Sequence, residues 1–240
     1  CRHNCCIGWE IDIDESTLKS YTSLKGKFSR KLKSGIAYND NCAFFRLDGK
    51  GRCAFLNENN LCDIILNLGE DSLCQICSDH PRFRNYFSDR TELGLGLCCE
   101  EAARIILCDT NNFSLDTLSD DNNKEYISEE ETEITDFRNR IFEIIKNKSI
   151  RTDAIAEALS SYCDTRYIKK SAKLWGEFLL TLERLDDYWE VILNELIITD
   201  ISGITVPESF DYIFRNFLTY LIYRHINEDF IKEDILWGFK

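Results

Sequence analysis

Apolar residues recur at helical spacing along the C-terminal half of the chain. One stripe covers 134–145, a longer one covers 174–196 with a break near Asp186, and a third covers 210–222. Pro207 is placed to occupy the first turn of the third helix. Apolar side chains at intervals of three and four residues form a helix face that packs into a core. The pattern therefore predicts a helical bundle from residue 134 onward.

The N-terminal half alternates between polar and apolar residues in shorter segments. Residues 10–14 alternate strictly, which indicates a short strand. Residues 44–47 and 53–56 flank a glycine-rich turn, and we expect them to pair as a hairpin. A second hairpin is predicted from 83–87 and 91–97.

Three helices are expected between and after these strands. Ser16 or Asp14 is placed to cap a helix that runs to about Leu32. Apolar residues at helical spacing cover 61–68 and stop at a glycine, which commonly ends a helix. Residues 100–108 begin with acids and continue as an apolar helix. The expected fold is therefore mainly α.

Charge is concentrated between the two halves. Residues 109–133 hold nine acids against one base, so they contribute −8 to a net charge of −13. Such runs are typical of a solvated linker, and the alternative is a segment that attracts a basic partner. We expect three parts: residues 1–110 with the cysteines, an acidic linker over 111–133 and a helical domain over 134–240.

Composition narrows the function classes. Hydrophobic residues make up 44% of the 240, so a packed core is expected. There is no apolar run of about 18 residues, so we expect no membrane span. The acidic balance argues against a nucleic-acid partner, which requires clustered Lys and Arg. The chain has no Met, so we expect that it begins inside a longer protein.

Cysteine is the most unevenly distributed residue. Eleven of the 12 fall in the first 108 residues, and only Cys163 lies beyond them. Metal ligation, disulfides and ordinary buried thiols are the alternatives. Cys74 and Cys77 have the spacing at which two thiolates bind one metal, whereas the adjacent pairs, such as Cys5 and Cys6, are awkward for disulfides. We favour a metal centre in this half, surrounded by the short hairpins and helices.

The metal itself stays open at this point. With only three histidines in the chain, a thiolate set suits either zinc or an iron–sulfur cluster. A radical-SAM loop has the pattern C-x3-C-x2-C. Cys1 and Cys5 fit its first two positions, but Gly8 stands at the third, so radical chemistry is not expected.

The order and spacing of the cysteines also resemble a known family. The segments that carry the resemblance cover about residues 1–108: Cys1-x3-Cys5-Cys6-x2-Trp9-x-Ile11-Asp12-Ile13-Asp14, Gly51-Arg52-Cys53-x-Phe55-Leu56, Leu61-Cys62-x-Ile64, Leu68-Gly69, Leu73-Cys74-x2-Cys77, Pro81-Arg82 and Leu97-x-Cys99-x-Glu101-Ala102-Ala103-Arg104. The combination resembles the bacterial flagellin lysine-N-methylases. It is also similar to a broader group of cysteine-rich proteins thought to chelate zinc or iron. Glu100 stands where the family tends to have proline.

The resemblance implies an enzyme that methylates lysine side chains of flagellin in the bacterial cytoplasm. It implies S-adenosylmethionine (SAM) as methyl donor and a [4Fe-4S] cluster, with zinc as the alternative metal. The implied metal ligands are the shared cysteines: Cys1, Cys5, Cys6, Cys53, Cys62, Cys74, Cys77 and Cys99. The cysteines outside the shared pattern are expected to be ordinary thiols: Cys42, Cys98, Cys108 and Cys163.

Four polar residues near the cysteines are candidates to contact SAM: Asp79, His80, Arg82 and Glu101. Each has a local structural role as its alternative, since polar residues beside metal sites often support the ligands. No Gly-rich loop of the Rossmann type marks a SAM pocket, and no catalytic base is assigned. The alternative function is a metal-binding module without catalysis.

Overall fold

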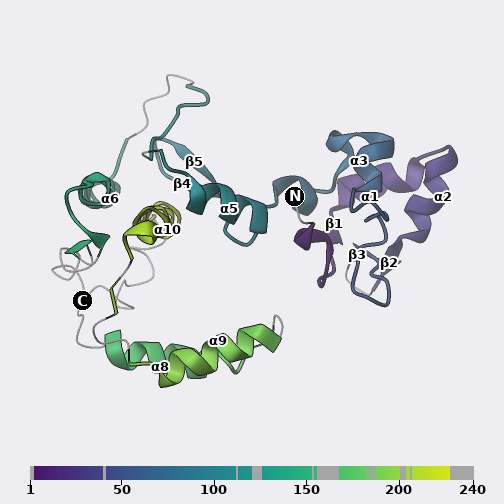
Figure 1. Ribbon diagram of the computed structural model, residues 1–240. Coiled ribbons are helices and arrows are strands. Elements are labelled where there is room, and N and C mark those ends of the chain that lie inside the picture. The colour runs from purple at the N-terminus through teal and green to yellow at the C-terminus, as the bar shows by residue number, and fades with distance from the viewer. Residues whose placement is uncertain are drawn as a thin grey trace. The chain divides into compact units, whose positions relative to one another are not determined.

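The computed structural model describes residues 3–39, 42–111, 113–120, 126–152, 154–155, 168–182, 184, 187–200, 204–205 and 207–227 (Figure 1). Cys1, Cys163 and Asp186 therefore lie outside the described residues. The chain divides into two compact units, one of residues 1–86 with 90–108 and the other of residues 87–89 with 109–240. Helices dominate both, which confirms the mainly α class.

A small antiparallel sheet begins the first unit. Its strands are β1 (Asp12–Ile13), β2 (Ile36–Tyr38) and β3 (Ala43–Phe45), in the order β1-β3-β2. The expected hairpin of 44–47 with 53–56 forms in a shortened version, because Leu47 and Cys53 make an antiparallel bridge and the Ala54 N–H donates to the Arg46 carbonyl at 2.9 Å. The Asp48 carboxylate accepts the N–H groups of Lys50 and Arg52, which closes the glycine-rich turn between the two segments.

Two helices follow β1 where one was expected. α1 (Glu15–Ser23) begins at Asp14, whose side chain accepts the Thr17 N–H at 2.9 Å, so Asp14 rather than Ser16 is the cap. α2 (Lys27–Ser34) starts after Gly26, whose φ of 109° is incompatible with a continuous helix.

The remaining elements of the first unit are short. They are the 3-10 turns η1 (Asn4–Cys6) and η2 (Glu70–Ser72), the helices α3 (Asp63–Leu68), α4 (Gln75–Asp79) and α5 (Glu100–Cys108), and the hairpin of β4 (Arg82–Tyr86) with β5 (Thr91–Leu95). The hairpin, α5 and the end of α3 at Gly69 confirm the predictions.

The core of the first unit joins these elements to the cysteines. Leu32, Phe45, Phe55 and Ile64 are almost fully buried, and the rings of Phe45 and Phe55 meet edge to face at 5.1 Å. Cys53 and Cys74 are buried in the same cluster. These two cysteines are therefore part of the core rather than a surface loop.

Five elements are described in the second unit: α6 (Glu129–Lys146), α8 (Ile168–Leu179), α9 (Asp187–Ile198), the 3-10 turn η4 (Glu208–Phe210) and α10 (Asp211–His225). Pro207 precedes η4 instead of lying in the first turn of α10.

Helix α6 starts earlier than expected, so the acidic linker does not extend to residue 133. Ser128 accepts the N–H of Glu131, and the Glu131 carboxylate accepts the N–H of Ser128, which forms a capping box. The acids of the first turn are favourable there because the N-terminus of a helix carries partial positive charge.

The predicted apolar stripes of the second unit differ in how deeply their side chains are buried. Ile134, Ile141, Phe142 and Ile145 of α6 are buried, as predicted. In the longer stripe, Leu193 is buried while Leu174, Trp175 and Phe178 are exposed. α8 and α9 pack on each other, and α6 packs on α10. No helix among the residues described has the length and apolarity that crossing a membrane requires.

Candidate functional site

Six of the eight cysteines that the resemblance implies as ligands come together in the first unit: Cys5, Cys6, Cys53, Cys62, Cys74 and Cys77. We call them the thiol cluster. The Sγ atoms of Cys5 and Cys6 lie 3.9 Å apart. The Cys6 thiol lies in the electrostatic field of Cys53 and Cys62, and the Cys77 thiol lies in that of Cys74, Cys6 and Cys53. Residues from four separate stretches of sequence therefore share one site.

Backbone contacts bring the first of these stretches together. The Cys53 N–H donates to the Cys6 carbonyl at 2.8 Å, and an isolated bridge pairs Ile7 with Arg52. Both contacts fix η1 against the turn that carries Cys53. A second bridge, between Leu56 and Cys62, joins this turn to the start of α3.

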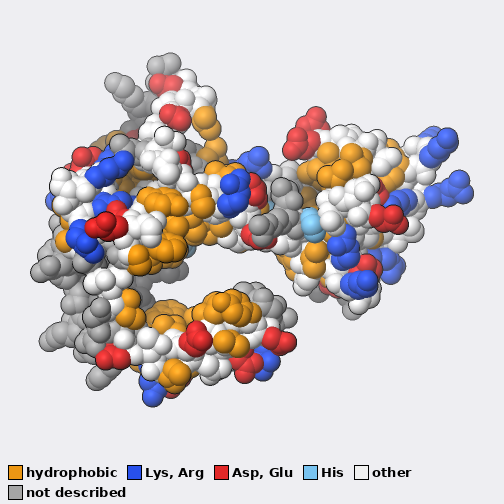
Figure 2. Space-filling model, viewed as in Figure 1, with side chains coloured by type: hydrophobic (Ala, Val, Ile, Leu, Met, Phe, Trp, Pro, Cys, Tyr) orange, Lys and Arg blue, Asp and Glu red, His pale blue; other side chains and the backbone are white. Residues whose placement is uncertain are grey.

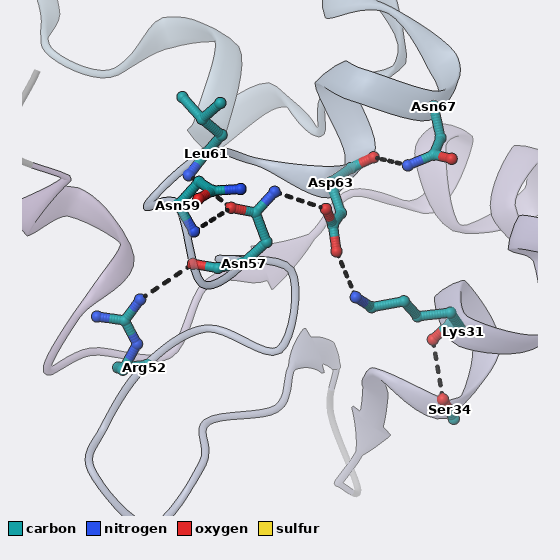
Figure 3. Close-up of polar contacts among 8 residues, drawn as sticks. All are labelled: Lys31, Ser34, Arg52, Asn57, Asn59, Leu61, Asp63 and Asn67. Carbon is teal, nitrogen blue, oxygen red and sulfur yellow. Dashed lines mark hydrogen bonds and ion pairs between the residues drawn. The ribbon is translucent and has the colours of Figure 1, made fainter.

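A polar network holds the loop that delivers Cys62 (Figure 3). The Asn57 Oδ1 atom accepts the N–H groups of Asn59 at 2.9 Å and Leu61 at 3.1 Å, which closes the loop on itself. The Asn57 Nδ2 atom donates to Asp63, the residue after Cys62, at 3.0 Å. Asp63 in turn pairs with Lys31 of α2. The position of Cys62 is thereby tied to a helix far away in the sequence.

Asp14 positions the Cys74–Cys77 knuckle from β1 and α1. Its Oδ2 atom accepts the N–H of Gln75, the first residue of α4, at 2.9 Å, while its Oδ1 atom caps α1. These hydrogen bonds, with Gln75 contributing most, hold the pKa of Asp14 far below its usual range. The buried Tyr21 also connects α1 to the segment before the knuckle, because its hydroxyl donates to the Ser72 carbonyl at 2.6 Å.

The thiols of the cluster form two asymmetric pairs. The hydrogen bond between Cys5 and Cys6 lowers the pKa of Cys5 to about 6, and the one between Cys74 and Cys77 lowers the pKa of Cys74 to about 7. The pKa values of Cys6 and Cys77 are raised by the same bonds and by burial. Each pair therefore favours one thiolate and one thiol, and the thiolate is the form that binds metals and attacks electrophiles.

The donor chemistry of the thiol cluster suits a thiophilic metal. The ten described cysteines are free of disulfides, so the disulfide alternative finds no support. Within the described ranges, however, no three Cys, His, Asp or Glu side chains are arranged to hold one metal ion. The metal centre is therefore a proposal that rests on the gathering of the thiols.

Cys99 directly precedes α5, and its role as a ligand stays a prediction. The neighbouring Cys98 carbonyl accepts a hydrogen bond from the side chain of Asn4, the residue before Cys5, at 3.3 Å. Cys98 and Cys108 are exposed. Cys42 donates to Asp12 at 3.2 Å and to Asn39 rather than to another cysteine.

Three of the four residues predicted to contact SAM form ion pairs or hydrogen bonds with residues close to them in the sequence. Asp79 pairs with Arg84 at 2.9 Å, Arg82 donates to the Ser78 carbonyl at 2.8 Å, and Glu101 pairs with Arg104 at 2.6 Å. These contacts match the structural alternative for each residue, and SAM contact remains a prediction.

His80 differs from the other three candidates. It precedes the cis proline Pro81, and its ring centroid lies 6.1 Å from that of Trp9. Its Nε2 atom is buried without a hydrogen-bond partner among the described atoms, and burial lowers the pKa of the imidazole. Among the four candidates, His80 is therefore the one whose buried Nε2 atom can still form a hydrogen bond.

The residues that position the thiols were not singled out from the sequence. Asp14 falls inside the shared segment at the start of the chain, so its place in that motif was a usable signal. Asn57 and Tyr21 gave no signal, since an asparagine in a polar loop and a tyrosine in a helix are common.

Comparison with known proteins supports the resemblance. Over 121 residues, 48% of this chain, the sequence is 30% identical to the lysine-N-methylases of Salmonella typhimurium and Salmonella choleraesuis. It is 29% identical over 121 residues to the flagellar biosynthetic protein FliU of Salmonella muenchen, of which the match covers 72%. No family model and no solved structure matches the chain.

The match covers 30% of the length of each of the two lysine-N-methylases, so much of those proteins has no counterpart in the alignment. The similarity nevertheless agrees with the family predicted from the cysteine pattern. The chain is therefore a relative of the lysine-N-methylases.

Proposed function

We propose that this protein takes part in SAM-dependent methylation of lysine side chains on flagellin. The observation that carries the proposal is the similarity to the two Salmonella lysine-N-methylases, and the FliU name supports a flagellar substrate. The alternative, a zinc- or iron-binding module without catalysis, is favoured by the thiol cluster taken alone.

Methyl transfer to lysine needs an unprotonated amine beside the donor. A free lysine has a pKa of about 10.4, so the site must desolvate the amine or supply a base. The amine lone pair forms the new N–C bond while the C–S bond of SAM breaks. The sulfur leaves as a neutral thioether and the product amine releases a proton. Alignment of the two reactants supplies most of the catalysis in such a displacement.

The thiol cluster is the proposed place of the metal. Its six thiols would hold an iron–sulfur cluster or zinc, together with Cys1 and Cys99 if the full implied set is used. When bound, such a centre would cross-link four stretches of chain, and an iron left without a thiolate ligand would supply a Lewis acid for the carboxylate of SAM. Asp14 and Asn57 then keep the ligand-bearing segments in place. A reducing compartment such as the bacterial cytoplasm keeps these thiols available.

Metal analysis and methyl transfer together test the proposal. Anaerobically purified protein is expected to be brown and to contain iron and sulfide, and it is expected to move labelled methyl from SAM to lysines of purified flagellin. Cys74→Ser should abolish metal binding, whereas Cys163→Ser should retain it. Colourless protein that carries zinc and leaves flagellin unlabelled would favour the non-catalytic module. Loss of metal in Cys163→Ser would contradict the ligand assignment.

A further inference from the structure

Helix α2 is held rigidly by its inner face. Leu32 is fully buried in the core of the first unit, and the ring of Phe28 packs against that of Phe55 at 6.4 Å. The helix ends at Gly35, where an added Cβ would lie 2.4 Å from the Phe55 ring. The side chains on its outer face are therefore presented from a fixed support.

That outer face is rich in bases. Lys27, Arg30 and Lys33 are exposed, and at about 100° per residue they fall on the arc opposite Phe28 and Leu32, while the exposed Lys31 lies at the edge of that arc. Lys25 precedes them, and residues 25–34 contain no acid. Figure 2 shows Lys and Arg side chains projecting at the end of the unit where Figure 1 places α2. We call these five residues the α2 basic face.

Most of this positive charge is uncompensated. Lys31 pairs with Asp63, whereas no carboxylate of a described residue pairs with Lys25, Lys27, Arg30 or Lys33. Like charges three and four residues apart destabilise a helix by a few tenths of a kcal/mol per pair. Residues 1–108 hold 14 bases against 15 acids, so this face concentrates positive charge in a part of the chain that is nearly neutral as a whole. It is a candidate surface for an anionic partner.

The chemistry of the face favours acidic side chains of a protein over other anions. A helix that enters a membrane surface needs apolar side chains beside its bases, and here Phe28 and Leu32 are turned into the core. Binding of single-stranded nucleic acid relies on aromatic stacking, and the outer arc of α2 has no aromatic residue. Separate bases on a rigid helix match carboxylates on a protein partner.

The α2 basic face is also connected to the thiol cluster. Lys31 pairs with Asp63, and Asp63 directly follows Cys62. We propose that the α2 basic face binds acidic residues that flank the target lysine of the protein substrate. This rests on the proposed methyltransferase function. The face would hold the substrate chain while the lysine reaches the site.

Charge reversal on the outer arc tests the proposal. The triple variant Lys27→Glu, Arg30→Glu, Lys33→Glu changes only exposed side chains that pair with no described residue, so it should fold, which circular dichroism checks. The control is Arg140→Glu, Lys146→Glu, Lys148→Glu, which makes the same change in net charge on exposed positions of the second unit. The probe is a fluorescein-labelled Glu-rich peptide with one central lysine, and the read-out is anisotropy at low and high salt.

We expect the α2 variant to bind this peptide roughly ten-fold more weakly than the wild type and the control, with binding to wild type weakening as salt rises. Equal losses in both variants would overturn the proposal, because they would reflect net charge alone. Tighter binding of wild type to phosphatidylserine vesicles or to single-stranded DNA than to the peptide would overturn it in favour of those partners.

A kinetic assay separates this inference from the proposed function. With flagellin as substrate, the α2 variant should raise KM and leave kcat nearly unchanged. If the wild type binds the peptide but transfers no methyl group, the proposed function fails and the docking surface stands. If the wild type methylates flagellin and the α2 variant matches it in KM, the docking surface fails and the function stands.

Discussion

At the scale of single residues, the Asp14 side chain connects two helices. One carboxylate caps α1 through Thr17 and also holds the first N–H of α4 through Gln75. The two helices thereby share one anchor next to β1. Because Cys74 directly precedes α4, the position of half of a thiol pair depends on a residue 60 positions earlier.

Replacing Asp14 should give a pH-dependent loss of stability. Hydrogen bonds to the ionised carboxylate lower its folded pKa below the unfolded value of about 3.9, so its contribution is present above that pH and is lost as the pH falls. Asp14→Ala should cost about 1 kcal/mol near neutral pH, the usual value of an N-cap, and less below pH 4 or so. Urea unfolding at several pH values measures this.

Ser16→Ala is the matched control for Asp14. It removes one donor to the same carboxylate, at 2.7 Å, and leaves the bond from Gln75 intact. We expect a smaller loss than in Asp14→Ala. A loss in Asp14→Ala that is the same at every pH would contradict the role given to the charge.

At the scale of elements, close packing decides where helices end and how they dock. Gly35 ends α2 against the ring of Phe55, which is almost completely buried. Gly35→Ala should destabilise the first unit by about 1–3 kcal/mol, since the added methyl meets a ring that has no room to move. Thermal unfolding gives the comparison with Gly49→Ala, where nothing lies within 4 Å of the added Cβ. Equal effects of the two changes would show that the contact is unimportant.

Capping decides the start of α6 in the second unit. Ser128→Ala removes the acceptor for the Glu131 N–H and should cost about 1 kcal/mol. The exposed Ser114 lies outside any helix, so Ser114→Ala should have no measurable effect on urea unfolding. An unchanged midpoint in Ser128→Ala would mean that the capping box contributes little.

At the scale of the whole molecule, each compact unit has a core of its own. Phe45 and Phe55 lie in the first, and Ile141 and Ile145 lie in the second. Multidomain chains commonly unfold in more than one step. The acidic segment and the basic face of α2 further show that net charge is not spread evenly over the chain.

Metal removal should therefore act on one unit. If the thiol cluster holds a metal as proposed, a chelator should lower the midpoint of one calorimetric transition by roughly 10 °C or more, because metal binding free energy is folding free energy. Gly35→Ala should shift the same transition, and Ser128→Ala should shift the other. A chelator that moves both transitions equally, or neither, would argue against a metal centre confined to the cysteines.

The elements that were predicted well depend on local sequence. The helix over 100–108 and the hairpin around 88–90 follow from short-range patterns, and both form as expected. The pairing of 44–47 with 53–56 is shorter than predicted. The break between α1 and α2 at Gly26 was not predicted, because a single glycine within a polar stretch carries little signal. Contacts between residues that are far apart in the sequence leave no such local pattern.

The sequence by itself determined the mainly α class, the family resemblance and the types of donor available, because composition, periodicity and cysteine spacing are properties of the chain. Only the tertiary structure decided which thiols meet. Cys5, Cys53, Cys62 and Cys74 come together through long-range contacts made by Asp14, Asn57 and the buried core. It also decided that the bases of α2 face solvent, since that follows from burying Phe28 and Leu32 on the opposite side. Packing sets these neighbours, and packing joins residues that the sequence keeps apart.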